Sequence, residues 1–417
     1  MEQAPAMDVN INYLDSSSWD AAMPARFRWL RENDPVYWAE KSNLWVLTRF
    51  EDVAQVSKRQ DLFTSARGVR PDNPVKLGLI DEDEPRHTHL RKLINKGFSP
   101  RMVKKLEVTF RQLVAETLDA VAARGECDFV EDVAVPLPLL LIAEMMGIRK
   151  EDRDRFHRWS DDMIAGDGNL HRPEIIQKAG RAYLEYSRYV TGIIEDRRTH
   201  PRDDLVSILV GAKDAGFLEE YQGQEGTFYG EQPDEEVVHL ANDELIKLMV
   251  ILLVAGNETT RNALSGGMQL LIEHPKECRQ LVDDPSKIPM AVEEMLRLVS
   301  PVHSFSRTVT RDTELRDKKL EAGQKVLMIY PSANRDPAAF PEPDVFRIDR
   351  NPHHVAFGIG SHFCLGANLA RMEMRVAFGE ILRRFPDMEY AAGGPELRPS
   401  ALVRSCTHMH VRYTPEA

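Results

Sequence analysis

The stretch Phe357-Gly-Ile-Gly-Ser-His-Phe-Cys-Leu-Gly366 decides the fold of this chain. Its glycines permit backbone conformations and close approaches that a side chain would block. Segment 367–385 lacks proline and is rich in helix formers, so Cys364 is expected just before a helix N-terminus. Backbone amides and the helix dipole stabilise negative charge there, which favours a thiolate. The alternative is a buried structural cysteine beside a tight turn.

Length and composition limit the class of protein. The 417 residues suffice for one large domain or two domains, and the net charge of -12 argues against a general nucleic-acid binder. The four cysteines, Cys127, Cys278, Cys364 and Cys406, are widely spaced, which predicts reduced thiols and a cytoplasmic protein. Residues 1–19 have no signal-peptide pattern, and the apolar run 248–255 is far shorter than the ~20 residues of a spanning helix. We therefore expect no membrane anchor.

The pattern along the chain predicts a mainly α protein with a smaller β-rich lobe. Segments rich in β-branched and aromatic residues fall at about 35–50, 302–335 and 386–413. Helical periodicity dominates most of the remainder. Residues 212–242 carry four glycines and many acids, which indicates an acidic surface excursion of unknown role. We expect residues 1–417 to form a single domain.

The longest expected helix, 243–273, changes character in its middle. The apolar run 248–255 indicates burial, and Gly256-Asn-Glu-Thr-Thr260 follows it directly. Polar groups inside a buried helix are costly unless they are paired or functional. One interpretation is a local groove that carries an acid, Glu258, and an alcohol, Thr259. The other is purely structural: the threonine bonds the carbonyl four residues back, and the glutamate reaches a partner.

Two shorter helices carry charged pairs at helical spacing. His87 and Arg91 lie four residues apart, on one face of an expected helix. They form either a cationic clamp for a carboxylate or phosphate, or part of a solvated charged surface. Glu294 and Arg297 lie three apart, a spacing that is common on helix surfaces and weak by itself.

Together, and in this order, these motifs resemble those of the cytochrome P450 family. The cysteine stretch matches the family's heme-binding signature at every fixed position, and Ala255-Gly-x-Glu-Thr259 matches its oxygen-activating helix motif. Glu294-x-x-Arg297 matches its helix pair, and Arg350 falls where the third member of that pair lies. His87-x-x-x-Arg91 matches its propionate-binding helix.

The resemblance implies the P450 fold, with heme b between the long central helix and the helix that follows the cysteine. Cys364 would be the proximal iron ligand, and Glu294, Arg297 and Arg350 a structural ion-pair triad. Thr259 and Glu258 would lie over the distal face, orient a water and deliver protons to dioxygen. Further implied cofactor contacts include the propionate-binding cations and residues beside the heme: His362, His87, Arg91, Arg307, Phe357, Gly358, Gly366 and Ala255.

The implied activity is insertion of one oxygen atom from dioxygen into an apolar small molecule, such as a steroid, terpenoid or fatty-acid-like compound. The sequence is similar to bacterial members that oxidise steroids and branched lipids. No reductase domain follows residue 417, so electrons are expected from a separate ferredoxin and its reductase, with NAD(P)H acting only indirectly. Basic residues expected to dock that ferredoxin are Lys96, Arg101, Lys104, Lys105, Arg371 and Arg375.

Residues expected to line the substrate pocket come from four separate segments. Each is also consistent with a place in the core, and the substrate, the oxidised position, the natural redox partner and the oligomeric state stay open. The candidates are Leu77, Leu79, Ile80, Val254, Ala255, Val302, Phe305, Leu402 and Val403.

Three other classes of protein compete with this interpretation. A heme-binding sensor or carrier without turnover would leave Glu258 and Thr259 unexplained. A zinc protein would use His353, His354, His362 and Cys364, which are acceptable ligands at a spacing that fits no zinc-finger pattern. A dinucleotide-binding loop fails, because its third glycine would fall on Phe363.

Overall fold

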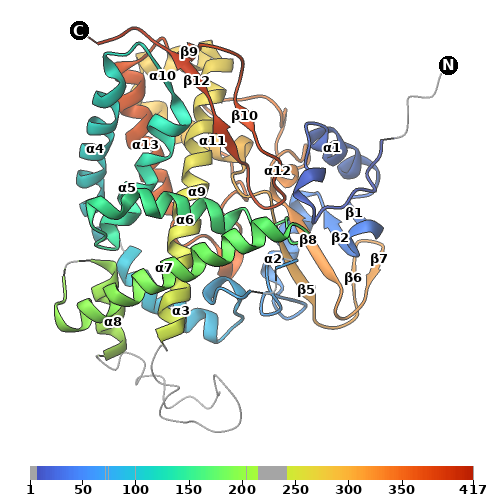
Figure 1. Ribbon diagram of the computed structural model, residues 1–417. Helices are drawn as coiled ribbons and strands as arrows, with labels where there is room; N and C mark the ends of the chain where they lie inside the picture. The colour runs from blue at the N-terminus through green and yellow to red at the C-terminus, as the bar shows by residue number, and fades with distance from the viewer. Residues whose placement is uncertain are drawn as a thin grey trace.

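The computed structural model describes residues 7–70, 72–73, 75–98, 100–202, 204–214 and 242–416. The expected acidic excursion at 212–242 lies outside these ranges, except for its ends, which belong to helices. None of the helices within these ranges is long and apolar enough to cross a bilayer. The described chain is dominated by helices, with the strands gathered in small sheets (Figure 1).

Helices extend over most of the chain. They are α1 (Met23–Asn33), α2 (Phe50–Lys58), α3 (Arg86–Ile94), α4 (Pro100–Ala122), α5 (Pro136–Met145), α6 (Arg153–Ile164), α7 (Pro173–Thr199), α8 (Leu205–Asp214), α9 (Asn242–Glu273), α10 (Pro275–Asp283), α11 (Ile288–Val299), α12 (Tyr330–Ala333) and α13 (Ala367–Arg384).

The strands are short. They are β1 (Val36–Ala39), β2 (Leu44–Leu47), β3 (Phe63–Thr64), β4 (Glu126–Asp128), β5 (Ser304–Val309), β6 (Thr313–Leu315), β7 (Lys318–Leu320), β8 (Lys325–Ile329), β9 (Glu389–Tyr390), β10 (Glu396–Leu397), β11 (Cys406–His408) and β12 (His410–Arg412). All except β3 and β4 fall in the three expected segments. Those two exceptions form only because β5 and β12 supply their hydrogen-bond partners.

The largest sheet has the strand order β1-β2-β8-β5-β3 and lies beside the helical body (Figure 1). The pair β2–β8 is parallel, whereas β5–β8 is antiparallel. Alternate residues of β8 face opposite sides: Leu327 packs with Phe27 and Leu30 of α1, and Val326 packs with Val53 of α2. The sheet is therefore buried on both faces, as its period-two apolar pattern requires.

Helix α9 passes through the centre of the helical body and contacts α5, α6, α7, α11 and α13. It continues through Gly256 without interruption. The reason for this glycine is packing, because a Cβ there would lie 2.6 Å from the Cδ1 atom of Ile142 in α5. Gly267 serves the same purpose toward α13, where a Cβ would lie 2.6 Å from the Cζ atom of Phe378. Small residues thus let the central helix approach its neighbours closely.

Candidate active site

The loop before α13 holds Cys364 in a fixed conformation. The amide of Cys364 donates to the carbonyl of Phe357 at 2.9 Å, and the amide of Phe363 donates to the carbonyl of Gly360 at 3.0 Å. Gly358 and Gly360 have φ angles of +69° and +79°, and a Cβ on Gly360 would lie 3.0 Å from the Ser57 carbonyl oxygen. Both positions therefore need glycine.

The thiol of Cys364 is free and its side chain is exposed. Although solvent reaches it, the protein crowded around it desolvates the thiol and raises its pKa. The amides of Gly366 and Ala367 and the guanidinium groups of Arg91 and Arg371 act in the opposite direction. The loop thus provides positive charge and amide donors for a thiolate, as expected for a ligand to a cation.

Four basic side chains predicted to bind propionates lie together. The rings of His87 and His362 are 4.1 Å apart between centroids. Burial and the neighbouring Arg307, His87 and Arg91 lower the pKa of His362 to about 3. Arg307 is 5% exposed. Within the described ranges, neither Arg91 nor Arg307 forms an ion pair. The Nδ1 atom of His87 contacts Glu84 Oε1 at 3.2 Å, so the charge that lacks an ion pair lies on Arg91 and Arg307.

Two further observations test whether a heme fits these residues. The Nε2 atom of His87 is buried and has no hydrogen-bond partner. A Cβ added at Gly366 would meet no protein atom within 4 Å, so protein packing does not explain that glycine. A ligand with two carboxylates would satisfy the histidine and offset the charge of the arginines. The donor set therefore fits heme propionates beside a thiolate.

On α9, Ala255 is exposed in a helix that is otherwise mostly buried, and Thr259 follows it by four residues. The Thr259 hydroxyl donates to the Ala255 carbonyl at 2.7 Å. This is the back-bond that the structural interpretation predicts. Because the side chain stays partly exposed, its oxygen can also accept a hydrogen bond from a water or ligand.

The Glu258 carboxylate is fully buried and turned toward α6. Its Oε1 atom lies 2.5 Å from Nη2 of Arg261 and accepts from Nδ2 of Asn262 at 3.0 Å. Arg261 in turn pairs with Asp161 at 3.0 Å. Burial raises the pKa of Glu258, although Arg261 opposes the shift, and its Oε2 atom has no partner. The structure thus brings Ala255 and Thr259 together and directs the Glu258 carboxylate elsewhere.

Sequence reasoning did not identify the partners of Glu258. Arg261 follows it by three residues, a spacing that signals a helix pair. Asp161 is nearly a hundred residues away, so no local pattern indicates it.

The expected ion-pair triad is present. Arg297 makes two contacts with Glu294, at 2.7 and 2.8 Å, and both side chains have no exposed surface. Arg350 donates to Glu294 Oε1 at 3.0 Å. Arg297 also donates to the carbonyl oxygens of Asn334 and Pro343, both at 2.7 Å. The triad therefore joins α11 to the segment that leads into the cysteine loop.

One expected docking residue has another partner. Arg371 donates to Glu293 at 2.7 and 2.8 Å, and its guanidinium lies 4.6 Å from the centroid of the Phe357 ring. It supports the cysteine loop and is not a free surface cation. Lys104, Lys105 and Arg375 are exposed. The side chains of Lys96 and Arg101 lie outside the described residues.

The expected pocket residues fall into two groups. Leu77, Leu79 and Val403 are buried. Partly buried are Ile80, Val254, Val302, Phe305 and Leu402. Val302 and Val403 form an isolated antiparallel bridge, and the His303 amide donates to the Leu402 carbonyl at 2.8 Å. The structure therefore joins the segment after α11 to the C-terminal turn.

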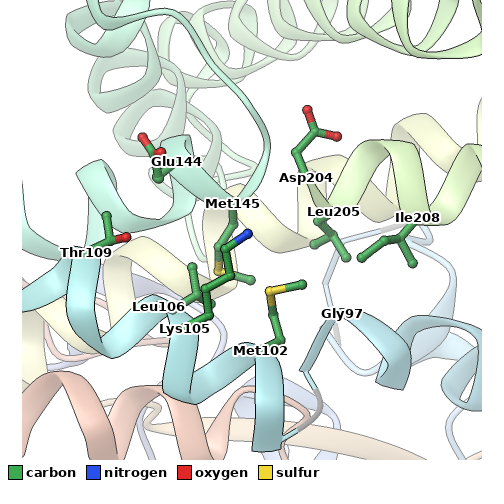
Figure 2. Close-up of a pocket in the computed structure, with 10 residues that line it drawn as sticks. All are labelled: Gly97, Met102, Lys105, Leu106, Thr109, Glu144, Met145, Asp204, Leu205 and Ile208. Carbon is green, nitrogen blue, oxygen red and sulfur yellow. The ribbon is translucent and has the colours of Figure 1, made fainter. Parts of the chain in front are cut away.

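Two cavities lie away from the cysteine loop. A cavity of about 180 Å³ includes Val403 in its lining. Another, of about 60 Å³, lies between α4, α5 and α8, with Met102, Leu106 and Leu205 around it and Glu144 and Asp204 near its edge (Figure 2). None of the expected heme-binding or substrate-pocket residues lines this smaller cavity.

The zinc interpretation finds no support in the geometry. His354 contacts Glu293 at 3.2 Å, whereas His362 lies beside His87. Among the residues that the structure describes, no group of three or more His, Cys, Asp or Glu side chains is arranged to hold a metal ion.

Comparisons with known proteins agree with this geometry. A family model described as Cytochrome P450 matches residues 9–399. The steroid C26-monooxygenase of Mycolicibacterium smegmatis is 39% identical over 400 residues, covering 95% of this chain and 94% of that protein. The methyl-branched lipid omega-hydroxylase of Mycobacterium bovis is 35% identical over 408 residues, covering 93% and 90%.

A solved structure is also similar. CYP109E1 from Bacillus megaterium in complex with testosterone has a TM-score of 0.83 at 33% sequence identity, covering 96% of this chain and 99% of that one. The chain therefore belongs to the cytochrome P450 family, and it is a heme b-dependent monooxygenase that receives NAD(P)H electrons through redox partners.

Proposed function

We propose that this chain inserts one oxygen atom from dioxygen into a steroid, a terpenoid or a branched, fatty-acid-like lipid. The similarity to a steroid C26-monooxygenase and a methyl-branched lipid omega-hydroxylase supports this substrate class. So does the similarity to a structure that holds testosterone. We also propose that residues 1–417 form one domain, which the family match over 9–399 supports.

The observation that carries the proposal is the placement of free Cys364 near Arg91, which lies with Arg307 and His362 in one cluster. Bound heme supplies dioxygen activation, and a thiolate ligand favours cleavage of the O–O bond, a property of cytochromes P450 as a class. His87, Arg91, Arg307 and His362 would bind and orient the two propionates. Phe357, against which the Arg371 guanidinium packs, would lie beside the iron ligand.

On the opposite side, the chain's own groups handle water and protons. The Thr259 hydroxyl donates to the Ala255 carbonyl, so its oxygen is oriented to accept a hydrogen bond from a water. Glu258 does not point to the same side as Thr259, and its Oε1 atom is held by Arg261 and Asn262. Its proposed role is therefore a proton reserve behind Thr259, because its Oε2 atom is unpaired and burial raises its pKa. Such positioned groups act as a general-acid relay.

The proposed electron donor is a ferredoxin with an NAD(P)H-dependent reductase. Exposed Lys104 on α4 and Arg375 on α13 support docking of an acidic protein on an otherwise acidic chain. A cytoplasmic location is proposed with it, because all four cysteines carry free thiols.

The test is a visible spectrum of the purified, reduced protein with carbon monoxide. The strongly red-shifted Soret band of a thiolate-ligated heme is expected, and Cys364→Ser is expected to abolish it while Cys278→Ser keeps it. Without that band in the unaltered protein, the proposed function falls. A protein that shows the band but forms no product with ferredoxin, reductase and any apolar compound is a sensor or carrier.

A further inference from the structure

The cavity of about 180 Å³ has both apolar and charged residues in its lining. Four parts of the chain meet around it: η1 (Ser16–Ser18), the end of α6 with its following loop, the start of α7, and segment 398–405. Ile164 and Val403 contribute apolar surface, whereas Ser16, Arg172, Arg398 and Ser405 contribute polar groups. None of the heme-binding residues lines it.

Ser405 provides the first sign of a ligand. The residue is only 3% exposed, and its Oγ atom is buried without a hydrogen-bond partner. By contrast, Ser16 Oγ accepts from the Ala401 amide at 3.2 Å, and Ser400 Oγ accepts from the Val403 amide at 3.3 Å. A buried hydroxyl without a partner is uncommon in proteins and calls for an explanation. The Ser405 hydroxyl could donate a hydrogen bond to an anion bound in the cavity.

The charges around the cavity provide the second sign. Arg172 and Arg398 are exposed, and within the described ranges neither makes an ion pair. One acid, Asp167, lines the cavity and accepts from Arg70 and Asn73. Asp15 accepts from Ser17, and although partial desolvation opposes the shift, Arg172 helps to lower the pKa of Asp15. Two guanidinium groups without an ion pair beside one cavity suit a carboxylate, which each can bind through two hydrogen bonds.

The start of α7 adds to this positive field. Arg172 is the N-cap of α7, a helix of 27 residues, and no side chain caps that end. The helix dipole therefore contributes partial positive charge beside Arg172. Glu174, in the first turn of α7, is exposed and is not part of the lining.

We propose that this cavity binds the carboxylate head group of an amphipathic substrate. Val403 lines the cavity and its backbone bridges that of Val302, and both residues are expected to line the substrate pocket, so the cavity adjoins the place where the apolar chain of such a substrate is expected. A head group held here directs the opposite end of the molecule to the reaction centre, which favours oxidation near the chain terminus. This inference rests on the proposed monooxygenase function and names its substrate class.

The experiment compares palmitate with methyl palmitate on the heme-loaded full chain. Affinities are measured by calorimetry and by the shift of the Soret band, so that binding is read independently of turnover. The double variant Arg172→Gln/Arg398→Gln is expected to weaken palmitate binding about tenfold and to leave methyl palmitate unchanged, since charge-assisted hydrogen bonds are the strong ones. Ser405→Ala is expected to weaken palmitate binding by a smaller factor.

Arg188→Gln is the matched control, because Arg188 is an exposed arginine of the same helix and does not line the cavity. It is expected to change neither affinity. Equal affinities for the acid and the ester, or variants that weaken both alike, would overturn the head-group site and leave the monooxygenase proposal standing. Absence of the carbon monoxide band in the unaltered protein would instead overturn the proposed function itself.

Discussion

The hydrogen bond of Thr259 leaves room for both interpretations of this residue. The Thr259 hydroxyl donates a hydrogen bond to the Ala255 carbonyl oxygen, with 2.7 Å between the two oxygens. This bond stabilises a polar side chain within a mostly buried helix. The oxygen lone pairs stay available on the partly exposed side. The two interpretations of this threonine are therefore compatible, and the back-bond orients the oxygen.

Replacing this hydroxyl is the sharpest prediction at the residue scale. Thr259→Ala is expected to lower product formation on the order of a hundredfold, because positioned proton-transfer groups contribute about 10²–10⁴ to a rate. NAD(P)H consumption is expected to continue, with the electrons recovered as hydrogen peroxide or water. The measurement is product and peroxide formed per NAD(P)H consumed.

Thr259→Ser is the control for this prediction, since it keeps the hydroxyl and removes only a methyl group. It is expected to retain most of the coupling between NAD(P)H consumption and product. Full coupling in Thr259→Ala would show that this hydroxyl takes no part in proton delivery.

At the scale of elements, an ion pair between Glu293 and Arg371 joins α11 to α13 beside their apolar packing. Partial burial alone would raise the pKa of Glu293, but hydrogen bonds from His354 and Arg371 lower it from 4.5 to about 2. The carboxylate is therefore charged at neutral pH and holds Arg371 over the Phe357 ring. This pair connects the helix of the ion-pair triad with the helix of the cysteine loop.

The pH dependence of this pair has a definite sign. Because the folded-state pKa lies below the unfolded value, the pair stabilises the fold above about pH 4.5 and loses this contribution as the pH falls toward 2. A shift of this size corresponds to roughly 3 kcal/mol at neutral pH. Denaturant unfolding of Glu293→Gln is measured at a series of pH values. Compared with the unaltered protein, this variant is expected to have a lower free energy of unfolding at pH 7. Its acid limb, the fall of that free energy as the pH drops below about 4.5, is expected to be flatter.

Glu380→Gln on α13 is the matched control, because Glu380 pairs with Arg383 at the surface and its pKa is also lowered. Such an exposed pair contributes little, so its acid limb is expected to match that of the unaltered protein. Identical acid limbs for all three proteins would contradict the role given to Glu293.

At the scale of the whole molecule, the triad of Glu294, Arg297 and Arg350 connects parts of the chain that are far apart in sequence. Arg297 reaches the backbone at Asn334 and Pro343, and Glu294 accepts from the Arg347 amide at 3.2 Å. With both charges of the central pair fully buried, the loss of one leaves the other uncompensated in the interior.

Glu294→Ala is therefore expected to lower the free energy of unfolding by about 3–5 kcal/mol. The thiolate-type carbon monoxide band is expected to weaken with it, because the segment leading into the cysteine loop is no longer held. The surface pair of Arg279 and Asp283 supplies the control, since Asp283→Ala is expected to cost less than about 1 kcal/mol. Equal losses for the two variants would contradict a structural triad.

Several features of the molecule follow from the sequence by itself. The glycines around Cys364, the spacing of Glu294 and Arg297, and the apolar run before Thr259 are local patterns. Each is set by backbone sterics or helical periodicity, which act over a few residues. The central helix was expected at 243–273 and spans Asn242–Glu273 for this reason. The cysteine loop, the α class and the β-rich segments were predictable in the same way.

Other features were decided only by the tertiary structure. Asp161 pairs with Arg261, and Arg371 pairs with Glu293. Arg172 and Arg398, more than 200 residues apart in sequence, line one cavity with Ser405. Strands β3 and β4 exist only because distant strands pair with them. Such contacts depend on how whole helices and sheets pack, and packing selects among side chains that look alike in sequence. The sequence by itself therefore determined the loop that carries Cys364, because backbone sterics act locally, whereas packing decided which charged side chains line the cavity beside Ser405.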